Sequence, residues 1–435
     1  MTARRKEFGV GVIGAGVVGG GVVRTLLDRA DLIAQKTGVR LCLRRVAEID
    51  PGVGEALGID ASLVTADAES LISDPHIDIV AELIGGERPA KELILHAFAN
   101  GKHVVTANKL LIAKHASELC RAAEKHGVEL RFEASVCGGI PILKALREGL
   151  VANKIERMLG IVNGTANYIL TQMTRANKSY EEALRDAQDN GFAEADPTLD
   201  VEGHDSAHKL KIIASLVFST DVDLDSIHVE GITDVTSEDV RYARELGYVI
   251  KLLAIARKVG EEIDLRVHPT LIPEDFVLAD VNDEYNAVYV EGDVVGTTLY
   301  YGKGAGRFPT TSAVLSDMID IAKDIQFGST GRIRPFVLGP KIAVKSIESL
   351  ESHYYMRFTT VDRPGVLGEI CSVLGSNNIS IASVIQKAVA DYEKQPVPIV
   401  LMTHRCSEGD VNRAVSHIDA LDSVRDKTRL IRVVE

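Results

Sequence analysis

A glycine-rich turn close to the amino terminus constrains this sequence more than any other feature. The apolar, β-branched run Phe8–Ile13 is typical of a strand, and Gly14, Gly16 and Gly19 follow it in the spacing GxGxxG, directly before a helical stretch. In that context the first glycine allows a tight turn, the second lets the backbone approach a pyrophosphate, and the third lets helix and strand pack closely. The turn therefore predicts a domain that binds a dinucleotide.

We expect the backbone of this turn to contact the cofactor, through Ile13, Gly14, Ala15, Gly16, Val17, Val18 and Gly19. An acidic residue at the end of the second strand, here Glu48 or Asp50, would bind the adenosine ribose, and its charge favours NAD because it repels the 2′-phosphate of NADP. Arg44 and Arg45 stand just before it and could instead bind that phosphate. The sequence thus leaves the choice between NAD and NADP open.

The first third of the chain continues this alternation of apolar strands and helices. Further strands are predicted over 41–49, 77–84, 103–106 and 128–136. Near-continuous apolar strands separated by helices indicate an α/β fold with a parallel sheet covered on both faces, which is the Rossmann arrangement.

After residue 140 the pattern changes to long helices, over 168–188 and 205–218, and to alternating stretches at 265–271 and 287–291, which predict an α+β domain. The last ~80 residues read β-α-β-β-α-β, the order of ferredoxin-like modules. The expected parts are a Rossmann domain (1–140, with 303–326 returning to it), a catalytic domain (141–302), a linker (327–349) and a C-terminal module (350–435).

The composition excludes several classes of protein. The chain carries 49 Lys and Arg against 62 Asp and Glu, a net charge of −13, and it has no basic cluster, so nucleic acid and anionic membranes are not expected partners. No apolar run reaches the ~20 residues of a membrane span, and no signal peptide precedes the first strand. The five cysteines lack disulfide-framework or metal-finger spacing. We therefore expect a cytoplasmic protein.

Two further motifs carry residues suited to catalysis. Lys109 ends the motif TANK after a predicted strand, at the edge where open α/β sheets bind ligands, although a lone lysine there is usually just solvated. Asp205 and Lys209 are four residues apart, so they share one face of a helix. Such a pair is more often a surface ion pair, but five carboxylates precede this lysine in a loop rich in Gly and Pro, which favours a site. His204 and His208 have the spacing of metal ligands but no third ligand, so zinc is not predicted.

Taken together, these motifs resemble those of homoserine dehydrogenases. The glycine turn, TANK at 106–109, NGTANYIL at 163–170 and GFAEADPTLDVEGHDSAHKL at 191–210 occur in the family's order. The segments Asp362–Leu367 and Ile379–Ile381 resemble an ACT regulatory module. The resemblance covers nearly the whole chain and implies reversible, NAD(P)-dependent reduction of L-aspartate 4-semialdehyde to L-homoserine. That reaction lies on the route to threonine, methionine and isoleucine.

The resemblance also implies roles for individual residues. Lys209 matches the family's proton donor and acceptor, and Glu194 and Asp205 match acids that hold the substrate. The implied catalytic residues are Lys209, Asp205 and Lys109. The implied substrate contacts are Glu194, Asp205, Asp200, Gly164 and Thr165. The implied cofactor contacts, beyond the glycine turn, are Arg45, Lys109, Gly191 and Gly306. Phe192 departs from the pattern, because many relatives have a tyrosine there.

The stretch from Glu133 to Ile140 matches the monovalent-cation loop of the family. The resemblance implies that Glu133 and the backbone carbonyls of Val136, Gly138 and Ile140 coordinate sodium, a cation that suits hard oxygen ligands. From its position alone, Glu133 would be taken for a surface residue at the end of a strand.

The ACT segment suggests regulation by a small molecule. Its Asp362–Gly365 turn leads into a helix whose N-terminal amides favour an anion such as an amino-acid carboxylate, and we expect L-threonine as allosteric inhibitor. ACT modules commonly pair, so a homodimer or homotetramer is expected, and the module could serve dimerisation alone. Two other functions remain open: an L-aspartate dehydrogenase, which would share the glycine turn but is not expected to carry the 194–209 motif, and a non-enzymatic amino-acid sensor.

Overall fold

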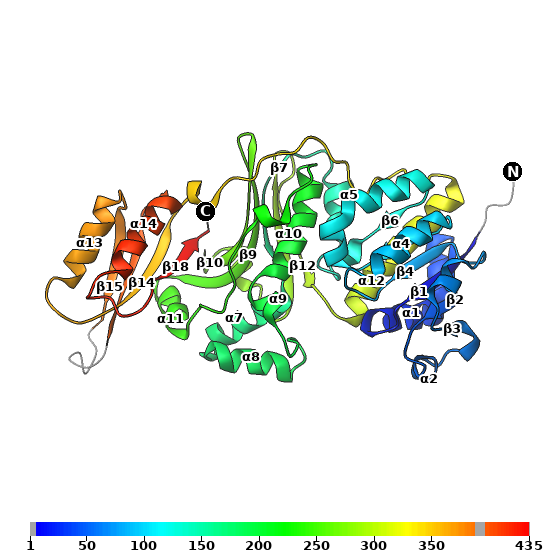
Figure 1. The fold of residues 1–435 in the computed structure, drawn as a ribbon, viewed down its shortest axis with the longest axis horizontal. Coiled ribbons are helices and arrows are strands. Elements are labelled where there is room, and N and C mark those ends of the chain that lie inside the picture. The colour runs from blue at the N-terminus through cyan, green and yellow to red at the C-terminus, as the bar shows by residue number, and fades with distance from the viewer. Residues whose placement is uncertain (1–5, 388–395, 435) are drawn as a thin grey trace. The chain divides into compact units, whose positions relative to one another are not determined.

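The computed structural model describes residues 6–387 and 396–434, which group into two compact units (Figure 1). Unit 1 comprises the chain up to Glu156 together with His208–Leu224 and Asn286–Ile342; unit 2 comprises Arg157–Ala207, Asp225–Tyr285 and the chain from Ala343 onward. The chain passes between the units several times, and helix α10 (His204–Val217) contributes residues to both.

Unit 1 contains a six-stranded parallel sheet in the order β3-β2-β1-β4-β5-β6. Its strands are β1 (Glu7–Ile13), β2 (Arg40–Ala47), β3 (Val64–Thr65), β4 (Ile79–Glu82), β5 (His103–Thr106) and β6 (Leu130–Arg131). This is the strand order of dinucleotide-binding domains, and it confirms the predicted parallel α/β sheet. The order reverses between β1 and β4, which places the turn after β1 at the edge where such sheets bind ligands.

The helices of unit 1 cover this sheet. They are α1 (Val17–Thr37), α2 (Val53–Leu57), α3 (Ala68–Ile72), α4 (Ala90–Ala99), α5 (Lys109–His126), α6 (Ile142–Lys144) and α12 (Arg307–Phe327). Although α12 lies almost 300 residues after α1 in the chain, the two helices pack together, as the blue and yellow ribbons of Figure 1 show. They share one apolar core with β1, formed by side chains such as Val12, Leu26 and Met318. The same unit holds the strand pair β11 (Tyr285–Gly292) and β12 (Gly296–Lys303).

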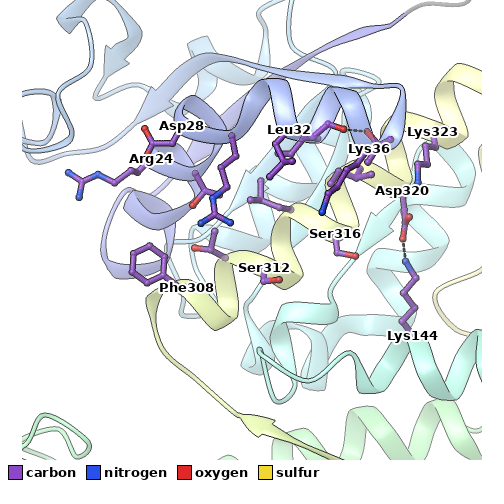
Figure 2. Close-up of a pocket in the computed structure, with 17 residues that line it drawn as sticks. Arg24, Asp28, Leu32, Lys36, Lys144, Phe308, Ser312, Ser316, Asp320 and Lys323 are labelled. Carbon is purple, nitrogen blue, oxygen red and sulfur yellow. Dashed lines mark hydrogen bonds and ion pairs between the residues drawn. The ribbon is translucent and has the colours of Figure 1, made fainter.

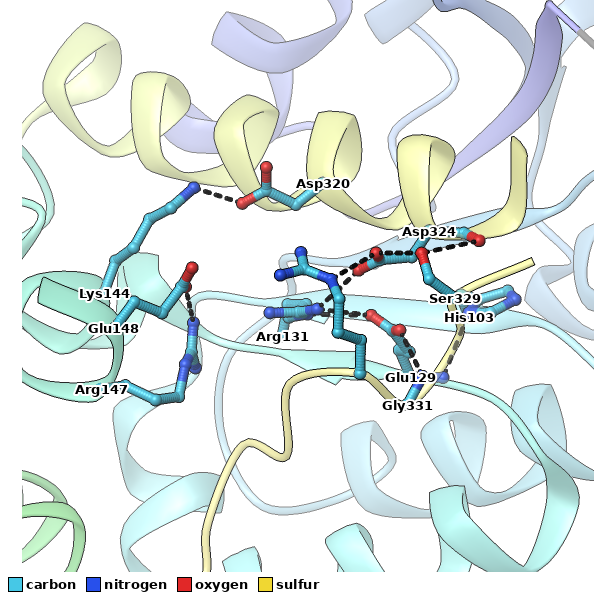
Figure 3. Close-up of polar contacts among 11 residues, drawn as sticks. His103, Glu129, Arg131, Lys144, Arg147, Glu148, Asp320, Asp324, Ser329 and Gly331 are labelled. Carbon is cyan, nitrogen blue, oxygen red and sulfur yellow. Dashed lines mark hydrogen bonds and ion pairs between the residues drawn. The ribbon is translucent and has the colours of Figure 1, made fainter. Parts of the chain in front are cut away.

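The strand expected over 128–136 is wrong beyond β6. Residues Glu133–Ser135 form a short 3-10 turn, because the Glu133 N–H donates to the Asp317 carboxylate of α12 at 2.8 Å and not to a neighbouring strand. A second contact fixes the strand itself: Arg131, 1% exposed, donates to Glu129 at 2.7 Å and to Asp324 of α12 at 3.1 Å. Figure 3 shows this buried cluster beneath α12.

Unit 2 combines helices with a largely antiparallel sheet. Its helices are α7 (Gly164–Ala176), α8 (Tyr180–Asp189), α9 (Thr198–Val201) and α11 (Ser237–Glu245), and its first strands are β7 (Ile155–Ile161), β8 (His228–Val229), β9 (Tyr248–Val259) and β10 (Glu262–Pro273). The single helix expected over 168–188 is wrong. Asn177 adopts a left-handed conformation, and Ser179 forms a capping box with Glu182 that starts α8.

The C-terminal module confirms the predicted β-α-β-β-α-β order. It consists of β14 (Tyr354–Thr360), α13 (Val366–Ser376), β15 (Ile381–Gln386), β16 (Val397–Thr403), α14 (Glu408–Asp419) and β18 (Arg429–Val433), with a short strand pair β13 (Glu351–Ser352) and β17 (Cys406–Ser407). The module's sheet has the order β18-β14-β16-β15. β18 also pairs with β10, where Arg432 lies opposite Thr270, so this sheet is continuous with that of the preceding strands.

Across residues 6–387 and 396–434, no helix combines the length and the hydrophobicity needed to cross a membrane.

Candidate active site

Three glycines shape the turn between β1 and α1, each in a different way. Gly14 has a φ of +86°, and a Cβ on Gly19 would lie 1.9 Å from the carbonyl oxygen of Gly14, so neither position accommodates a side chain. Gly16 precedes α1 without a side-chain cap, and nothing lies within 4 Å of where its Cβ would be. The amides of the first turn of α1 therefore remain open to an anion such as a pyrophosphate.

Glu48, at the end of β2, reaches back to this turn. Its carboxylate accepts hydrogen bonds from the N–H of Ala15 at 2.7 Å and from the N–H of Ile49 at 2.8 Å. The Arg45 guanidinium contacts Ser70 at 3.3 Å and Asp74 at 3.7 Å instead. Of the residues left open by the sequence, Glu48 lies at the glycine turn, whereas Arg45 is engaged near α3.

Lys109 begins α5, directly after β5, and is half-buried. The preceding residue, Asn108, caps α5 with its side-chain oxygen and donates from its amide to the carbonyl of Gly86 at 2.6 Å. The Thr106 hydroxyl donates to the buried carboxylate of Glu82 at 2.6 Å. These bonds join the loops after β4 and β5 at the carboxyl edge of the sheet, where Lys109 lies.

The Glu133 carboxylate lies inside unit 1 and binds backbone rather than solvent. It accepts hydrogen bonds from the N–H groups of Leu143 at 2.9 Å and Lys144 at 2.8 Å. Burial raises its pKa to about 8, with a smaller contribution from the charge of Asp317. Each carboxylate oxygen accepts one hydrogen bond, which leaves further lone pairs with which Glu133 could bind a cation in this loop.

The carbonyls named for such a cation differ in their availability. Ile140 accepts a hydrogen bond from the N–H of Ile142 at 2.7 Å. Within the described part of the chain, no hydrogen bond reaches the carbonyl oxygens of Val136 or Gly138. Between them, Cys137 has a φ of +48°, which turns the chain sharply. The loop therefore fits a small cation of the kind that binds carbonyl oxygens.

Asn163 lies at the centre of a polar cluster in unit 2. Its side-chain oxygen caps α7 by accepting from the N–H of Ala166 at 2.8 Å. Its amide donates to Asp200 at 2.7 Å and to Asp205 at 2.8 Å. The residue is 5% exposed, and one amide group thus draws two carboxylates together.

The loop with Gly191 and Glu194 is attached to α7. The Thr165 hydroxyl donates to the carbonyl oxygen of Phe192 at 2.6 Å, and the Phe192 ring packs on Tyr168 with centroids 4.8 Å apart. Gly191 has a φ of +74°, and the Glu194 side chain is exposed. Phe192 thus attaches this loop to α7 through both its carbonyl oxygen and its ring.

Asp205 and Lys209 both lie on α10 and are both buried, at 2% and 8% exposure. Their spacing places them on one face of the helix. Burial argues against the alternative that they form an ordinary surface ion pair. His204, by contrast, is exposed, and among the described residues no group of three or more His, Cys, Asp or Glu side chains is arranged to hold a metal ion.

Sequence reasoning missed two features of these surroundings. Asn163 was part of a recognised motif but was not singled out, and only its distant partners reveal its role. A cavity of about 740 Å³ between α1 and α12, whose basic lining includes Arg24, Lys36 and Lys323, was also not anticipated (Figure 2). That cavity does not include the glycine turn. A separate cavity of about 240 Å³ does, with Gly16 on one side and Arg307, next to Gly306 at the start of α12, on the other.

A Rossmann sheet with an open glycine turn, together with a helix that buries an acid and a lysine, defines an NAD(P)-dependent oxidoreductase. Comparison with known families agrees: residues 14–133 match "Homoserine dehydrogenase, NAD binding domain", residues 141–319 match "Homoserine dehydrogenase" and residues 354–423 match "ACT domain".

Full-length relatives support the same assignment. The chain is 43% identical to a homoserine dehydrogenase of Neisseria gonorrhoeae and 44% identical to one of Pseudomonas aeruginosa, over 98% of this chain and 99% of each relative. The crystal structure of a homoserine dehydrogenase from Thiobacillus denitrificans superimposes with a TM-score of 0.92 at 45% identity, over 99% of both chains. The chain therefore belongs to the homoserine dehydrogenase family, with a C-terminal ACT domain. It catalyses the NAD(P)-dependent interconversion of L-aspartate 4-semialdehyde and L-homoserine.

Proposed function

We propose that Lys209 exchanges a proton with the substrate oxygen, and that Asp205 and Glu194 bind the substrate's ammonium group. The observation that carries this proposal is the cluster around Asn163, which fixes the carboxylates of Asp200 and Asp205 at the start of the helix that also carries Lys209. Two closely held carboxylates attract an ammonium group, and both the aldehyde and the alcohol carry one.

The chemistry then divides between the bound cofactor and the protein. Hydride exchange with the aldehyde carbon is what the dinucleotide supplies. In the reducing direction negative charge develops on the substrate oxygen, and Lys209, as an ammonium, donates a proton to that atom. In the oxidising direction a neutral Lys209 accepts the hydroxyl proton. Burial of Lys209 supports this role, because it keeps bulk water away from the proton that the amine would exchange with the substrate.

The other residues implied by the resemblance position substrate and cofactor. Lys109 would contact both, and its place at the carboxyl edge of the sheet supports this. The remaining substrate contacts in the proposal are Asp200, Gly164 and Thr165, and the remaining backbone contacts to the cofactor are Gly191 and Gly306. Positive φ at the last two, +74° and +114°, favours glycine, and the absence of a side chain there lets the backbone approach a ligand closely.

For the dinucleotide, we place the pyrophosphate against Gly14–Gly19, with Ile13, Ala15, Val17 and Val18 in the same turn. Glu48 would bind the adenosine ribose, since its carboxylate already lies against the N–H of Ala15. This arrangement favours NAD over NADP, because Arg45 is held by Asp74 and Ser70. A homoserine dehydrogenase from a hyperthermophilic archaeon, 25% identical over 73% of this chain, has been solved with NADPH, so use of both cofactors is expected.

A monovalent cation, sodium, completes the proposal at the Glu133 loop. The Glu133 carboxylate and the carbonyls of Val136, Gly138 and Ile140 would bind it. The carbonyls of Val136 and Gly138, which no hydrogen bond from the described residues reaches, support this assignment, as does the buried carboxylate.

We also propose that the ACT domain, residues 350–435, binds L-threonine and that the chain forms a homodimer or homotetramer. The open amides at the start of α13 support a carboxylate ligand there, since Gly365 provides no side-chain cap. At the end of its sheet's strand order, β12 exposes Leu299 and Tyr301, which supports assembly through this edge. Such an enzyme would serve threonine, methionine and isoleucine synthesis in the cytoplasm, where the five free cysteines remain reduced.

The deciding experiment follows the increase in absorbance at 340 nm after the protein is mixed with L-homoserine and either NAD or NADP at alkaline pH. We expect reduction of both cofactors, faster with NAD, and none with L-aspartate as substrate. Reduction with L-aspartate would instead indicate an aspartate dehydrogenase. The same assay with sodium replaced by tetramethylammonium tests the cation, and we expect a lower rate without sodium.

A further inference from the structure

Arg432, in the last strand of the chain, joins the ACT domain to the strands that precede it. It is 3% exposed, and its guanidinium donates to both carboxylate oxygens of Glu230, each at 2.8 Å. The same guanidinium bonds Glu408 within the ACT domain, at 2.9 Å from its Nε. Glu230 directly follows β8, so this two-bond contact connects β18 to a loop of the substrate-binding region.

The pair is ionised on both sides. Burial opposes ionisation of Glu230, but hydrogen bonds from His228 and Arg432 hold the pKa of its carboxyl well below the usual range. A two-pronged arginine–carboxylate pair, here with a buried arginine and a half-buried glutamate, fixes orientation as well as distance. The position of Glu230 is therefore set by the ACT domain.

The residues next to Glu230 are packed backbone to backbone against the turn that precedes α10. A Cβ on Gly231 would lie 2.3 Å from the carbonyl oxygen of Val201, and the N–H of Ile232 donates to that same oxygen at 2.7 Å. From the other side, a Cβ on Gly203 would come within 3.2 Å of the carbonyl oxygen of Glu230. This contact leaves no room for Glu230 to shift without moving residues 201–203.

That turn leads straight into the proposed substrate site. Gly203 accepts the hydrogen bond of Ala207 in the first turn of α10, and Asp205 lies between them. Next to the contact is a cavity of about 390 Å³, with Glu202 and His204 on one wall and Leu430 of β18 on another. The cavity provides space into which the turn could move if the Glu230 contact were lost.

We propose that Glu230 and Arg432 are positioning residues for substrate binding. By holding the 201–203 turn in place, they set the orientation in which Asp205 meets the substrate's ammonium group, and they couple that orientation to the ACT domain. This inference rests on the substrate role proposed for Asp205.

A second arginine–carboxylate pair, between Arg357 and Asp239, provides a control. Arg357 of β14 donates from its Nε to Asp239 of α11 at 2.6 Å, and Asp239 is 1% exposed. This pair also connects the ACT domain to the preceding part of unit 2. The hydrogen bonds that the Asp239 carboxylate is found to accept come from Thr236, Tyr355 and Arg357 rather than from the 201–203 turn. Asp239→Asn therefore weakens a contact between the ACT domain and the rest of unit 2 without removing a contact to the 201–203 turn.

The test is steady-state kinetics of full-length Glu230→Gln and Asp239→Asn with L-homoserine. For Glu230→Gln we expect the KM for homoserine to rise roughly fivefold to tenfold, with the KM for the dinucleotide unchanged. For Asp239→Asn we expect neither KM to change, although both variants should unfold at lower temperature. Equal KM effects in the two variants would overturn the inference. If Glu230→Gln fails to fold, Arg432→Lys serves instead, because it keeps the charge but loses the two-pronged contact.

A double variant separates this inference from the role of Asp205. If Glu230 acts through Asp205, then adding Glu230→Gln to Asp205→Asn should raise the KM for homoserine little further. Independent, multiplying effects would overturn the proposal. If Asp205→Asn alone leaves the KM unchanged, the substrate role of Asp205 fails and this inference with it. If only Glu230→Gln leaves the KM unchanged, the inference fails and the role of Asp205 stands.

Discussion

Asn163 donates a hydrogen bond of 2.8 Å from its side-chain amide to the carboxylate of Asp205. The second N–H of that amide binds Asp200 at 2.7 Å, and the side-chain oxygen caps α7. One neutral side chain therefore does two separable things: it starts a helix and it holds two like charges together. Without the amide the two carboxylates would repel each other, and each would lose a buried hydrogen-bond donor.

Two substitutions at Asn163 separate these effects. Asn163→Ser keeps a side-chain oxygen for the cap but lacks both N–H donors, whereas Asn163→Ala loses cap and donors together. We expect both to raise the KM for homoserine by about tenfold or more, and only the alanine variant to lose a further ~1 kcal/mol of stability from the missing cap. Kinetics and thermal unfolding of the two proteins check this. A serine variant with a normal KM would remove the amide from substrate binding.

Lys209→Ala should lower kcat by about 10²- to 10⁴-fold, the usual contribution of a general acid or base. Binding of the reduced dinucleotide, followed by its fluorescence, should be unchanged, because Lys209 is proposed to act on the substrate oxygen. Lys211→Ala is the matched control: this lysine lies on the same helix and pairs with Asp221 at 3.9 Å. Comparable losses of kcat in both variants would point to damage to α10 rather than to a lost proton donor.

Glu48→Gln should shift cofactor preference toward NADP. Glutamine can still accept the hydrogen bond from the N–H of Ala15, so the turn is kept while the charge that repels a 2′-phosphate is removed. We expect the ratio of kcat/KM for NADP over NAD to rise about tenfold. Arg45→Gln should leave that ratio unchanged, and a marked loss of NADP use in this variant would show that Arg45 reaches the phosphate.

Gly365 allows a test of threonine binding with two nearly isosteric variants. Its φ of +97° is tolerated by Asn and Asp better than by other side chains. Gly365→Asp places a carboxylate at the start of α13, where it would repel the carboxylate of threonine, whereas Gly365→Asn adds no charge. We expect millimolar threonine to inhibit the wild type and the asparagine variant but not the aspartate variant. If threonine inhibits the wild-type enzyme in neither the reducing nor the oxidising direction of the reaction, the regulatory proposal is wrong.

Lys251 should make stability depend on pH. Burial, reinforced by the charge of Arg175, lowers the pKa of this lysine to about 7 in the folded protein, whereas an unfolded chain has a lysine pKa near ~10.4. Between these values the unfolded chain binds more protons, so the free energy of unfolding should rise with pH from about 7 to 10, by up to about 1.4 kcal/mol per unit. This increase in stability is complete once the pH exceeds the lysine pKa of the unfolded chain. It is lost as the pH falls through the lysine pKa of the folded protein, about 7.

Urea unfolding at pH 7, 8 and 9 measures this slope. Lys251→Met removes the titrating group but leaves the carbonyl oxygen of Val281, which accepts from the lysine at 2.6 Å, without that donor. The variant should therefore be less stable overall, yet its stability should rise less with pH than that of the wild type. Parallel curves for the two proteins would contradict the assignment.

Features that depend on short stretches of the chain could be predicted from the sequence. The glycine turn, the alternation of apolar strands with helices and the β-α-β-β-α-β module are all local patterns, and the strand orders confirm them. The break between α7 and α8 was also readable, since Ser179 and Glu182 form a capping box, but the helical pattern on both sides concealed it. Motif spacing likewise pointed to Asp205 and Lys209.

What the sequence could not supply were contacts between distant residues. β6 ends early because Glu133 bonds Asp317, 184 positions away. The amide of Asn163 donates to carboxylates that lie 37 and 42 residues later in the chain, and Arg432 donates to Glu230, which lies 202 residues earlier. Such partners depend on tertiary packing, which periodicity and composition do not encode at any one position.

The pairing of β18 with β10 also bears on how the chain folds during synthesis. β10 ends at Pro273, yet its partner β18 begins only at Arg429, so the sheet cannot close until residues 429–433 have left the ribosome. During that interval the edge of β10 stays open to other strands, and non-local pairing of this kind is slow. A chain that lacks residues 429–433, whether through stalled translation or through proteolysis, should therefore be prone to aggregation even though every proposed catalytic residue is already present.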